Sequence, residues 1–161
     1  MSEQSDQSNA VRSPGPTSKL AAFLAATRLE DIPIEVMTRA AHITLDGIGC
    51  ALVGAHLPWS ALAVEAVSGL ESTGPAMVVG WDRGLTPTAA ALLNSTFIQG
   101  FELDDYHELG PLHSASVVLP AAFATASALG RRVTGADLAL AIAMGALESA
   151  IHALETVIDA L

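Results

Sequence analysis

The segment PIEVMTRAAHITLDGIGCALVG, residues 33–54, decides the fold class of this chain. Asp31 followed two residues later by Pro33 is typical of a helix start, and the pattern predicts a helix from Pro33 to Gly54. Small side chains recur along it, which allows the backbone of a second helix to approach closely. These residues are Ala40, Ala41, Gly47, Gly49, Ala51 and Gly54.

The sequence on either side predicts further helices at residues 18–28, 58–72, 86–101, 114–130 and 134–161. The start signals are Thr17, Pro58, Thr86 with Pro87, Ser114 or Ser116, and Thr134 with Asp137 in capping-box spacing. Residues 76–79, between Gly74-Pro75 and Gly80, predict one brief strand. Because a lone strand is not stable, we expect it to pair with a segment outside this sequence.

The predicted fold is therefore mainly α, a multi-helix bundle with at most one short strand or β-hairpin remnant. Residues 1–16, MSEQSDQSNAVRSPGP, are polar and lack an apolar run, so we expect a disordered tail and not a signal peptide. Residues 17–161 are then the helical domain.

Composition limits the partners of the chain. Hydrophobic residues make up 51% of the sequence and charged residues 15%, with a mean hydropathy of +0.46. Several helices must be apolar nearly all round, which predicts burial on more than one side against a second copy or a missing domain. The net charge of −10 excludes nucleic acid as a partner, and Asp46 and Glu148 interrupt the apolar runs that would otherwise suggest a membrane span. The single cysteine, Cys50, allows no disulfide within the chain and is typical of a cytoplasmic protein.

The chemistry of the sequence is concentrated in residues 101–116, FELDDYHELGPLHSAS. Twelve of these residues contain four carboxylates and two histidines: Glu102, Asp104, Asp105, Glu108, His107 and His113. Ionised carboxylates favour the charged form of a neighbouring histidine, which suits a general acid. His113 precedes the predicted helix start, where free amide groups are expected to hold a substrate carboxylate.

Each of these residues also has a structural interpretation. Asp104 and Asp105 are equally typical of solvated loop charges or of a helix cap, and His107 of a surface residue. His113 suits a capping or core role, and Tyr106 suits ring packing. A metal site is the chemical alternative, but the spacing of the Asp, Glu and His residues matches no metal-binding signature, so we expect no metal.

Two stretches resemble the MmgE/PrpD family, which includes 2-methylcitrate dehydratase and cis-aconitate decarboxylase. Residues 94–107, NSTFIQGFELDDYH, are similar to the segment in which an asparagine precedes an acidic D/E-x-D-D motif. Residues 112–120, LHSASVVLP, resemble the helix start in which a histidine precedes small residues and, seven positions later, a proline. Shorter pieces at residues 45–54, 78–80, 87–90 and 130–140 agree, and the resemblance covers about residues 19–148.

The resemblance implies a lyase or isomerase that acts on a small carboxylic acid by dehydration, decarboxylation or epimerisation, without a cofactor. It implies a large helical domain and a homodimer. His113, Asp104 and Asp105 would be the catalytic residues, with His113 as proton donor or acceptor. The other polar residues of the segment are candidates for substrate binding: Glu102, Tyr106, His107 and Ser114. Gln99 stands where many members have histidine, and Ser114 where many have proline, which indicates a distant subgroup.

Length and charge both suggest that further protein completes the site. Members of the family are several hundred residues long and take a catalytic lysine and further histidine from later segments, whereas Lys19 is the only lysine here. A polycarboxylate would also be repelled by the acidic segment unless cationic groups come from elsewhere. We therefore expect a homodimer or a complementary carboxy-terminal half. The alternative is a catalytically inactive fragment that acts as a helical dimerisation or interaction module.

Overall fold

A computed structural model of the chain describes residues 15–107 and 112–146. The helices in this part are α1 (Pro16–Ala26), a 3₁₀ turn η1 (Leu29–Asp31), α2 (Ile34–Gly54), α3 (Ser60–Leu70), α4 (Pro87–Gln99), α5 (Ser114–Ala128) and a helix over residues 135–146. Two short strands, β1 (Thr73–Met77) and β2 (Gly84–Leu85), form the sheet of this part. The prediction of a mainly α fold is confirmed.

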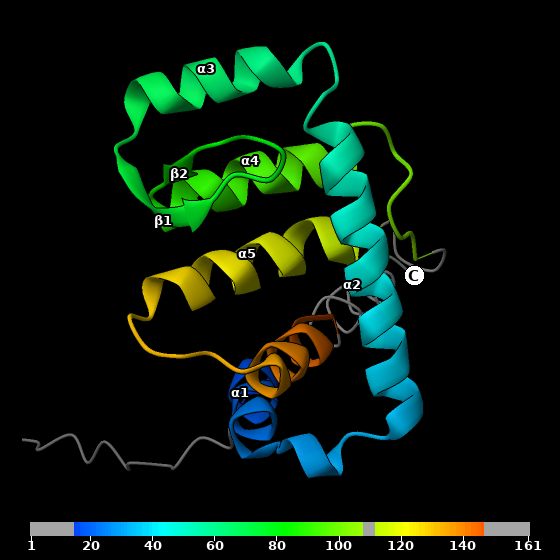
Figure 1. Cartoon of the computed structure of the whole chain (residues 1–161). Coiled ribbons are helices and arrows are strands. Elements are labelled where there is room, and N and C mark those ends of the chain that lie inside the picture. Colours follow the sequence, from blue (N-terminus) through cyan, green and yellow to red (C-terminus); the bar gives the residue numbers. More distant parts are fainter. Residues whose placement is uncertain (1–14, 108–111, 147–161) are drawn as a thin grey trace, which may run out of the picture.

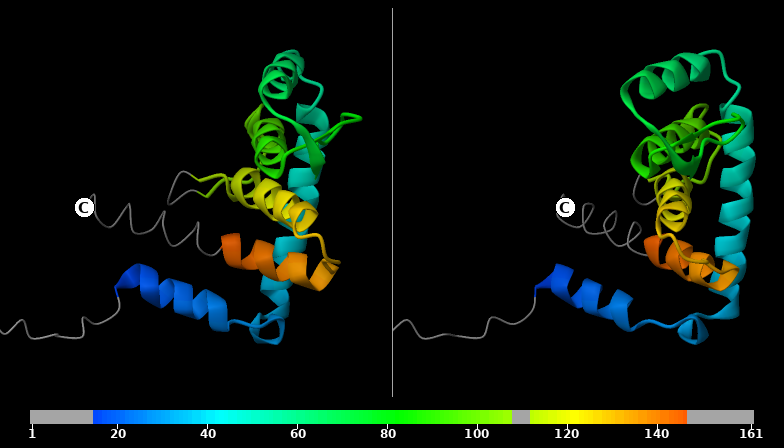
Figure 2. Two further views of the ribbon diagram at one scale, coloured as in Figure 1. Left: turned by 90° about the vertical axis from the view of Figure 1, so that its left-hand side faces the viewer. Right: turned by 60° about the vertical axis from the view of Figure 1, so that its left-hand side comes forward.

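The long helix α2 stands across the ends of a stack of helices (Figure 1). The stack runs from α3 through α4 and α5 to residues 135–146, with α1 beyond, and the rotated views show the same order (Figure 2). The core lies where α2, α4 and α5 meet, and its largest fully enclosed side chains include Phe97, Leu93 and Leu119. Asp104, Ser114 and Ser116 are also buried, where the loop after α4 joins α5.

Two glycines let α2 pass close to the stack. A Cβ atom on Gly54 would lie 1.8 Å from the backbone oxygen of Phe97 in α4. A Cβ atom on Gly47 would lie 2.3 Å from Leu119 Cδ1 in α5. The small-residue pattern of this helix therefore serves close helix crossing, as the sequence predicted.

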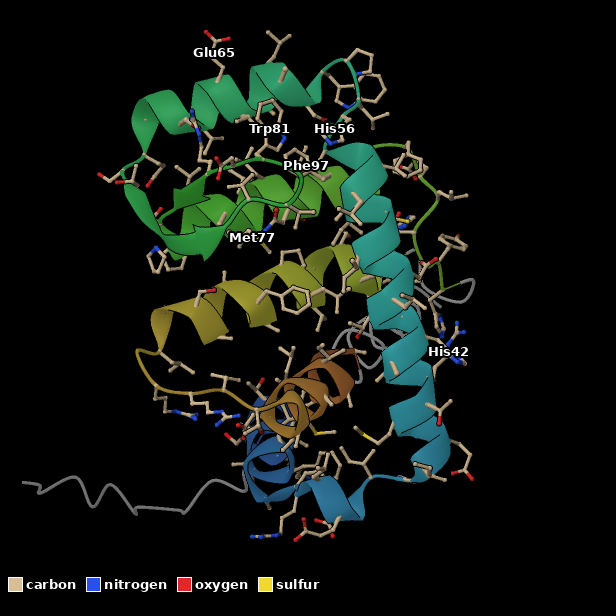
Figure 3. All side chains as sticks on the ribbon, in the orientation of Figure 1. His42, His56, Glu65, Met77, Trp81 and Phe97 are labelled. Carbon is tan, nitrogen blue, oxygen red and sulfur yellow. The ribbon has the colours of Figure 1, made fainter. Side chains whose placement is uncertain are left out.

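The hairpin is held to α4 by a buried asparagine. The Asn94 amide donates to Met77 O and accepts from the backbone N–H of Val79, both at 2.9 Å. The side chain thus pairs with the backbone much as a neighbouring strand would. Within the hairpin loop, the Trp81 indole (Figure 3) donates to Ala55 O, just beyond the end of α2, at 3.2 Å.

Several local predictions need correction. The predicted strand corresponds to β1, which pairs with β2 of this chain, because Gly84 and Leu85 return antiparallel beside it. The expectation that it pairs with a segment outside this sequence is therefore wrong. Helix α1 begins at Pro16 after the cap residue Gly15, and Thr17 is inside the helix and is not its cap. Helix α4 ends at Gln99 and not at Phe101.

Other local predictions are confirmed. Thr86 accepts a hydrogen bond from Ala89 N at the start of α4, with Pro87 as its first residue. Thr134 and Asp137 form the reciprocal capping box of the helix over residues 135–146. The predicted tail up to residue 14 and the predicted helix beyond residue 146 lie outside the described residues.

Within residues 15–107 and 112–146, no helix has both the length and the apolar character needed to cross a membrane.

Candidate active site

The acidic loop begins with a change of backbone direction after α4. Gly100 ends the helix, and Glu102 donates its backbone N–H to Gln99 O at 3.1 Å. Glu102 has φ 57°, a left-handed conformation that residues other than glycine seldom adopt. This turn sends the chain out of α4 and brings residues 102–107 alongside the start of α5.

His113 and Asp104 form the centre of the site. His113 Nδ1 lies 3.1 Å from Asp104 Oδ1. The side chain of Asp104 is 0% exposed and that of His113 is 18% exposed. When the carboxylate is ionised it can only accept, so Nδ1 carries the hydrogen and Nε2 is left for a reacting group. This is the arrangement by which an acid fixes the tautomer and the orientation of a catalytic histidine.

Burial makes the ionised form of Asp104 costly. Desolvation raises the pKa of Asp104 above its usual value, and the nearby His113 opposes this rise only in part. The second carboxylate oxygen, Oδ2, is buried and has no hydrogen-bond partner among the described residues. A buried, incompletely satisfied carboxylate beside a histidine is more typical of a functional site than of a stabilising contact.

Cys50 of α2 is in the core, close enough to Asp104 and Asp105 for their charges to affect its thiol. The side chain is buried, and this burial raises the pKa of the Cys50 thiol, with smaller contributions from the carboxylates of Asp46, Asp104 and Asp105. A protonated, enclosed thiol is unreactive. Cys50 therefore fills space in the hydrophobic core.

Asp105 has a different arrangement from Asp104. Its carboxylate accepts from Ser114 N at 3.2 Å and from Ala115 N at 2.7 Å, the first two amides of α5. The expectation that Ser114 or Ser116 caps this helix is wrong, because His113 is the cap residue and the capping oxygens come from Asp105. The same contacts correct a second expectation, since these two amides are not free to hold a substrate carboxylate.

Glu102 and Tyr106 lie around the histidine ring. Glu102 Oε2 is 3.7 Å from His113 Nε2, and its side chain is 72% exposed. The Tyr106 ring is tilted by 59° against the imidazole, with ring centroids 5.6 Å apart. The exposed edge of the imidazole therefore faces a charged and an aromatic side chain, both accessible to an incoming molecule.

The other predicted site residues are less closely associated with His113. His107 is half-buried and donates its backbone N–H to Leu112 O at 3.1 Å, while its Nδ1 is buried and has no partner among the described residues. Ser114 is buried at the start of α5. Glu108 lies outside the described residues. In the part of the chain that the structure describes, no three Asp, Glu, His or Cys side chains are arranged to hold a metal ion.

Ser116 and Gln99 also contact the site, and the sequence did not single out Ser116 for this role. Ser116 Oγ donates to His113 O at 2.9 Å and lies 3.3 Å from Gln99 Oε1. Since a hydroxyl has one hydrogen, the second contact is satisfied when the Gln99 amide turns its NH₂ group toward Ser116. A serine three residues after a helix cap often makes such a bond, so its spacing from His113 was an available signal.

Known proteins match this chain over most of its length. The MmgE/PrpD N-terminal domain matches residues 18–152. Cis-aconitate decarboxylase of Aspergillus terreus is 46% identical over 148 residues, which are 90% of this chain and 30% of that enzyme. Cis-aconitate decarboxylase-like protein oryM of Aspergillus oryzae is 47% identical over 134 residues, 80% of this chain and 28% of that protein. The chain thus spans about 30% of the length of these relatives, and it belongs to the MmgE/PrpD family.

Proposed function

We propose that this chain supplies the acid–base element of a lyase that decarboxylates a small unsaturated polycarboxylic acid of the cis-aconitate class. The observation that carries the proposal is the His113–Asp104 pair, with Nδ1 at 3.1 Å from a fully enclosed carboxylate. The names of the relatives favour decarboxylation over dehydration or epimerisation. Asp104 orients His113, and Nε2 is the atom that exchanges a proton with the substrate.

The chemistry requires a proton donor at a fixed position. Loss of carbon dioxide breaks a carbon–carbon bond and leaves its electron pair on the organic product, so a proton must reach a carbon atom. Protonated His113 can deliver that proton from Nε2 while Nδ1–H remains bonded to Asp104. Asp104 then stabilises the charged ring before transfer and keeps it aligned afterwards.

The negative charge of the chain indicates that further protein contributes to substrate binding. The chain has a net charge of −10, and Glu102 and Asp104 both lie within 4 Å of the His113 ring. A polycarboxylate at this position needs cationic groups to offset the repulsion. We propose that a second copy of the chain or a complementary carboxy-terminal half brings them, and that the enzyme works in the cytoplasm, where Cys50 stays reduced.

A chimaera tests the proposal directly. This chain would replace the matching 148-residue segment of the Aspergillus terreus enzyme, and release of carbon dioxide from cis-aconitate would be measured. We expect turnover, and we expect His113→Ala to reduce kcat by roughly 10²- to 10⁴-fold, the usual contribution of a general acid. The matched control is His42→Ala, an exposed histidine on α2 (Figure 3), which should keep full activity.

Two results would count against the proposal. A folded chimaera without turnover would argue that the chain does not provide a working acid–base element. Equal activity of the parent chimaera and its His113→Ala variant would remove His113 from the chemistry.

A second function, a helical dimerisation module, is favoured by the exposed apolar surface. Leu45, Ile48 and Leu52 follow one another at helical spacing on α2 and are 72%, 40% and 52% exposed. A mostly apolar groove of about 580 Å³ adjoins them, between α2, the hairpin and α5. A chimaera without activity, together with a stable dimer of the isolated chain in light scattering, would favour this function. A well-folded monomer would argue against it.

A further inference from the structure

Asp105 reaches across the loop to the start of the next helix. Its two carboxylate oxygens accept from Ser114 N at 3.2 Å and from Ala115 N at 2.7 Å. The cap residue itself, His113, makes no side-chain capping bond. The first two free amides of this 15-residue helix are therefore satisfied by a residue nine positions before its first residue.

Asp104, the residue before Asp105, contacts the side chain of His113. Asp104 Oδ1 contacts the imidazole Nδ1, while Asp105 holds the two peptide groups that follow His113. Two adjacent acids thus fix both the ring and the backbone of one histidine. Between the acids and His113 the loop is also closed by the backbone bridge from His107 N to Leu112 O.

We infer that Asp105 is a positioning residue, which acts by holding the backbone of His113 so that its ring stays against Asp104. Both Asp105 oxygens accept from backbone amides of α5, whereas the contact with the His113 ring is made by Asp104. These different roles of Asp104 and Asp105 rest on the proposed function, since both roles concern the histidine that the proposal makes the proton donor. They also imply that a substrate carboxylate is held by groups other than these two amides.

The test follows the imidazole itself in the 161-residue chain. Long-range ¹H–¹⁵N spectra distinguish an Nδ1–H ring from an Nε2–H ring, and the spectrum of His113→Gln identifies the signals of His113. At a pH where the ring is neutral, we expect the Nδ1–H tautomer to dominate in the native chain. In Asp105→Ala, we expect both nitrogen shifts to move toward the average of exchanging tautomers, together with faster hydrogen exchange at Ser114 and Ala115.

Asp137→Ala is the matched control, because Asp137 caps another helix by accepting from Thr134 N and Thr134 Oγ1. It removes a helix cap of the same residue type, and the His113 signals should stay unchanged. If Asp105→Ala does not fold, Asp105→Asn serves in its place, since its amide oxygen still accepts one of the two bonds. That variant should show a smaller shift in the same direction.

The inference is overturned if a folded Asp105 variant loses amide protection at Ser114 while His113 keeps the native tautomer. In that case Asp105 is a structural cap only. These spectra require no turnover, so their result is independent of the chimaera experiment. An inactive chimaera with a shifted His113 signal in Asp105→Ala would reject the proposed function and retain the positioning role.

Discussion

Asp104 has an environment that favours chemistry over stability. Its side chain is fully enclosed, one oxygen faces His113, and the other has no partner in the described part of the chain. Burial raises the pKa of Asp104, so the folded state binds a proton there more tightly than the unfolded state does. The folded protein therefore loses stability as Asp104 ionises.

Replacing Asp104 by asparagine should raise stability at neutral pH while abolishing the acid–base pair. The amide oxygen still accepts from His113 Nδ1, but the buried charge is gone. Because the folded-state pKa is raised, the advantage of Asp104→Asn should be absent below the unfolded value of about 3.8, should grow as pH rises from there to the folded-state pKa, and should stay constant above it. Urea unfolding of both proteins across this range measures the difference.

For Asp137→Asn we expect the opposite effect on stability at neutral pH. Hydrogen bonds from Thr134 lower the pKa of Asp137, so its contribution to stability is present above the unfolded value and is lost as pH falls through the lowered one. The asparagine variant should be the less stable protein at neutral pH. If Asp104→Asn shows this same pattern, the buried carboxylate is stabilising and its assignment to chemistry loses its main support.

At the scale of elements, the spacing of two glycines determines how α2 meets the stack. Gly47 contacts α5 and Gly54 contacts α4, seven residues apart on one helix. At about 1.5 Å per residue this separation is roughly 10 Å, which is close to the distance between two packed helix axes. One helix can thus approach two neighbouring helices at successive close crossings.

Gly54→Ala should therefore be strongly destabilising, and Gly49→Ala should not. A Cβ on Gly54 would meet the backbone of Phe97, which cannot move aside like a side chain, and we expect a loss of about 3 kcal/mol or more. Gly49 is exposed on the same helix with open space around it, so alanine there should add up to about 1 kcal/mol through helix propensity. Denaturant unfolding of both variants gives the comparison. Similar midpoints for the two would mean that α2 and α4 do not cross this closely.

At the scale of the whole molecule, apolar side chains remain uncovered on several helices. They include Leu45, Ile48, Leu52 and Val53 on α2, Val117 in the first turn of α5, Leu129 directly after α5, and Leu70 at the end of α3. A helix such as α5, with no charged residue in its 15 positions, is expected to be buried on all sides. The surface of this part of the chain is thus suited to contact with further protein.

If α2 forms the contact, the double variant Leu45→Glu, Leu52→Glu should weaken self-association. The two substitutions place two carboxylates on one helical face, where they repel each other. They also remove the apolar surface that the leucines would bury in the contact, which stabilises association by roughly 25 cal/mol per Å². Light scattering over a range of concentrations should show a smaller average mass than for the native chain. Leu70→Glu, at a position that is 88% exposed and remote from α2, is the control and should leave the mass unchanged. An unchanged mass in the double variant would mean that another face, or no face, is used.

Most helices could be predicted from the sequence, because many of the signals at their ends are local. Thr86 with Pro87, Thr134 with Asp137, and Gly130, which has a φ of 60° just after α5, each act within a few residues of the helix end that they specify. The acidic segment at residues 101–116 and the family resemblance could also be recognised from the sequence, since both depend on residue types in a fixed order.

Only the folded chain shows which atoms each of the two adjacent acids contacts. Asp104 and Asp105 are adjacent and chemically identical, and only the closure of a loop places one on the His113 ring and the other on the amides of α5. The pairing of β1 with β2 across the hairpin loop, and the support of both strands by α4, likewise depend on contacts between different elements. Local patterns specify an element because its hydrogen bonds join near neighbours, whereas a site is built from contacts that the chain makes only after it has folded.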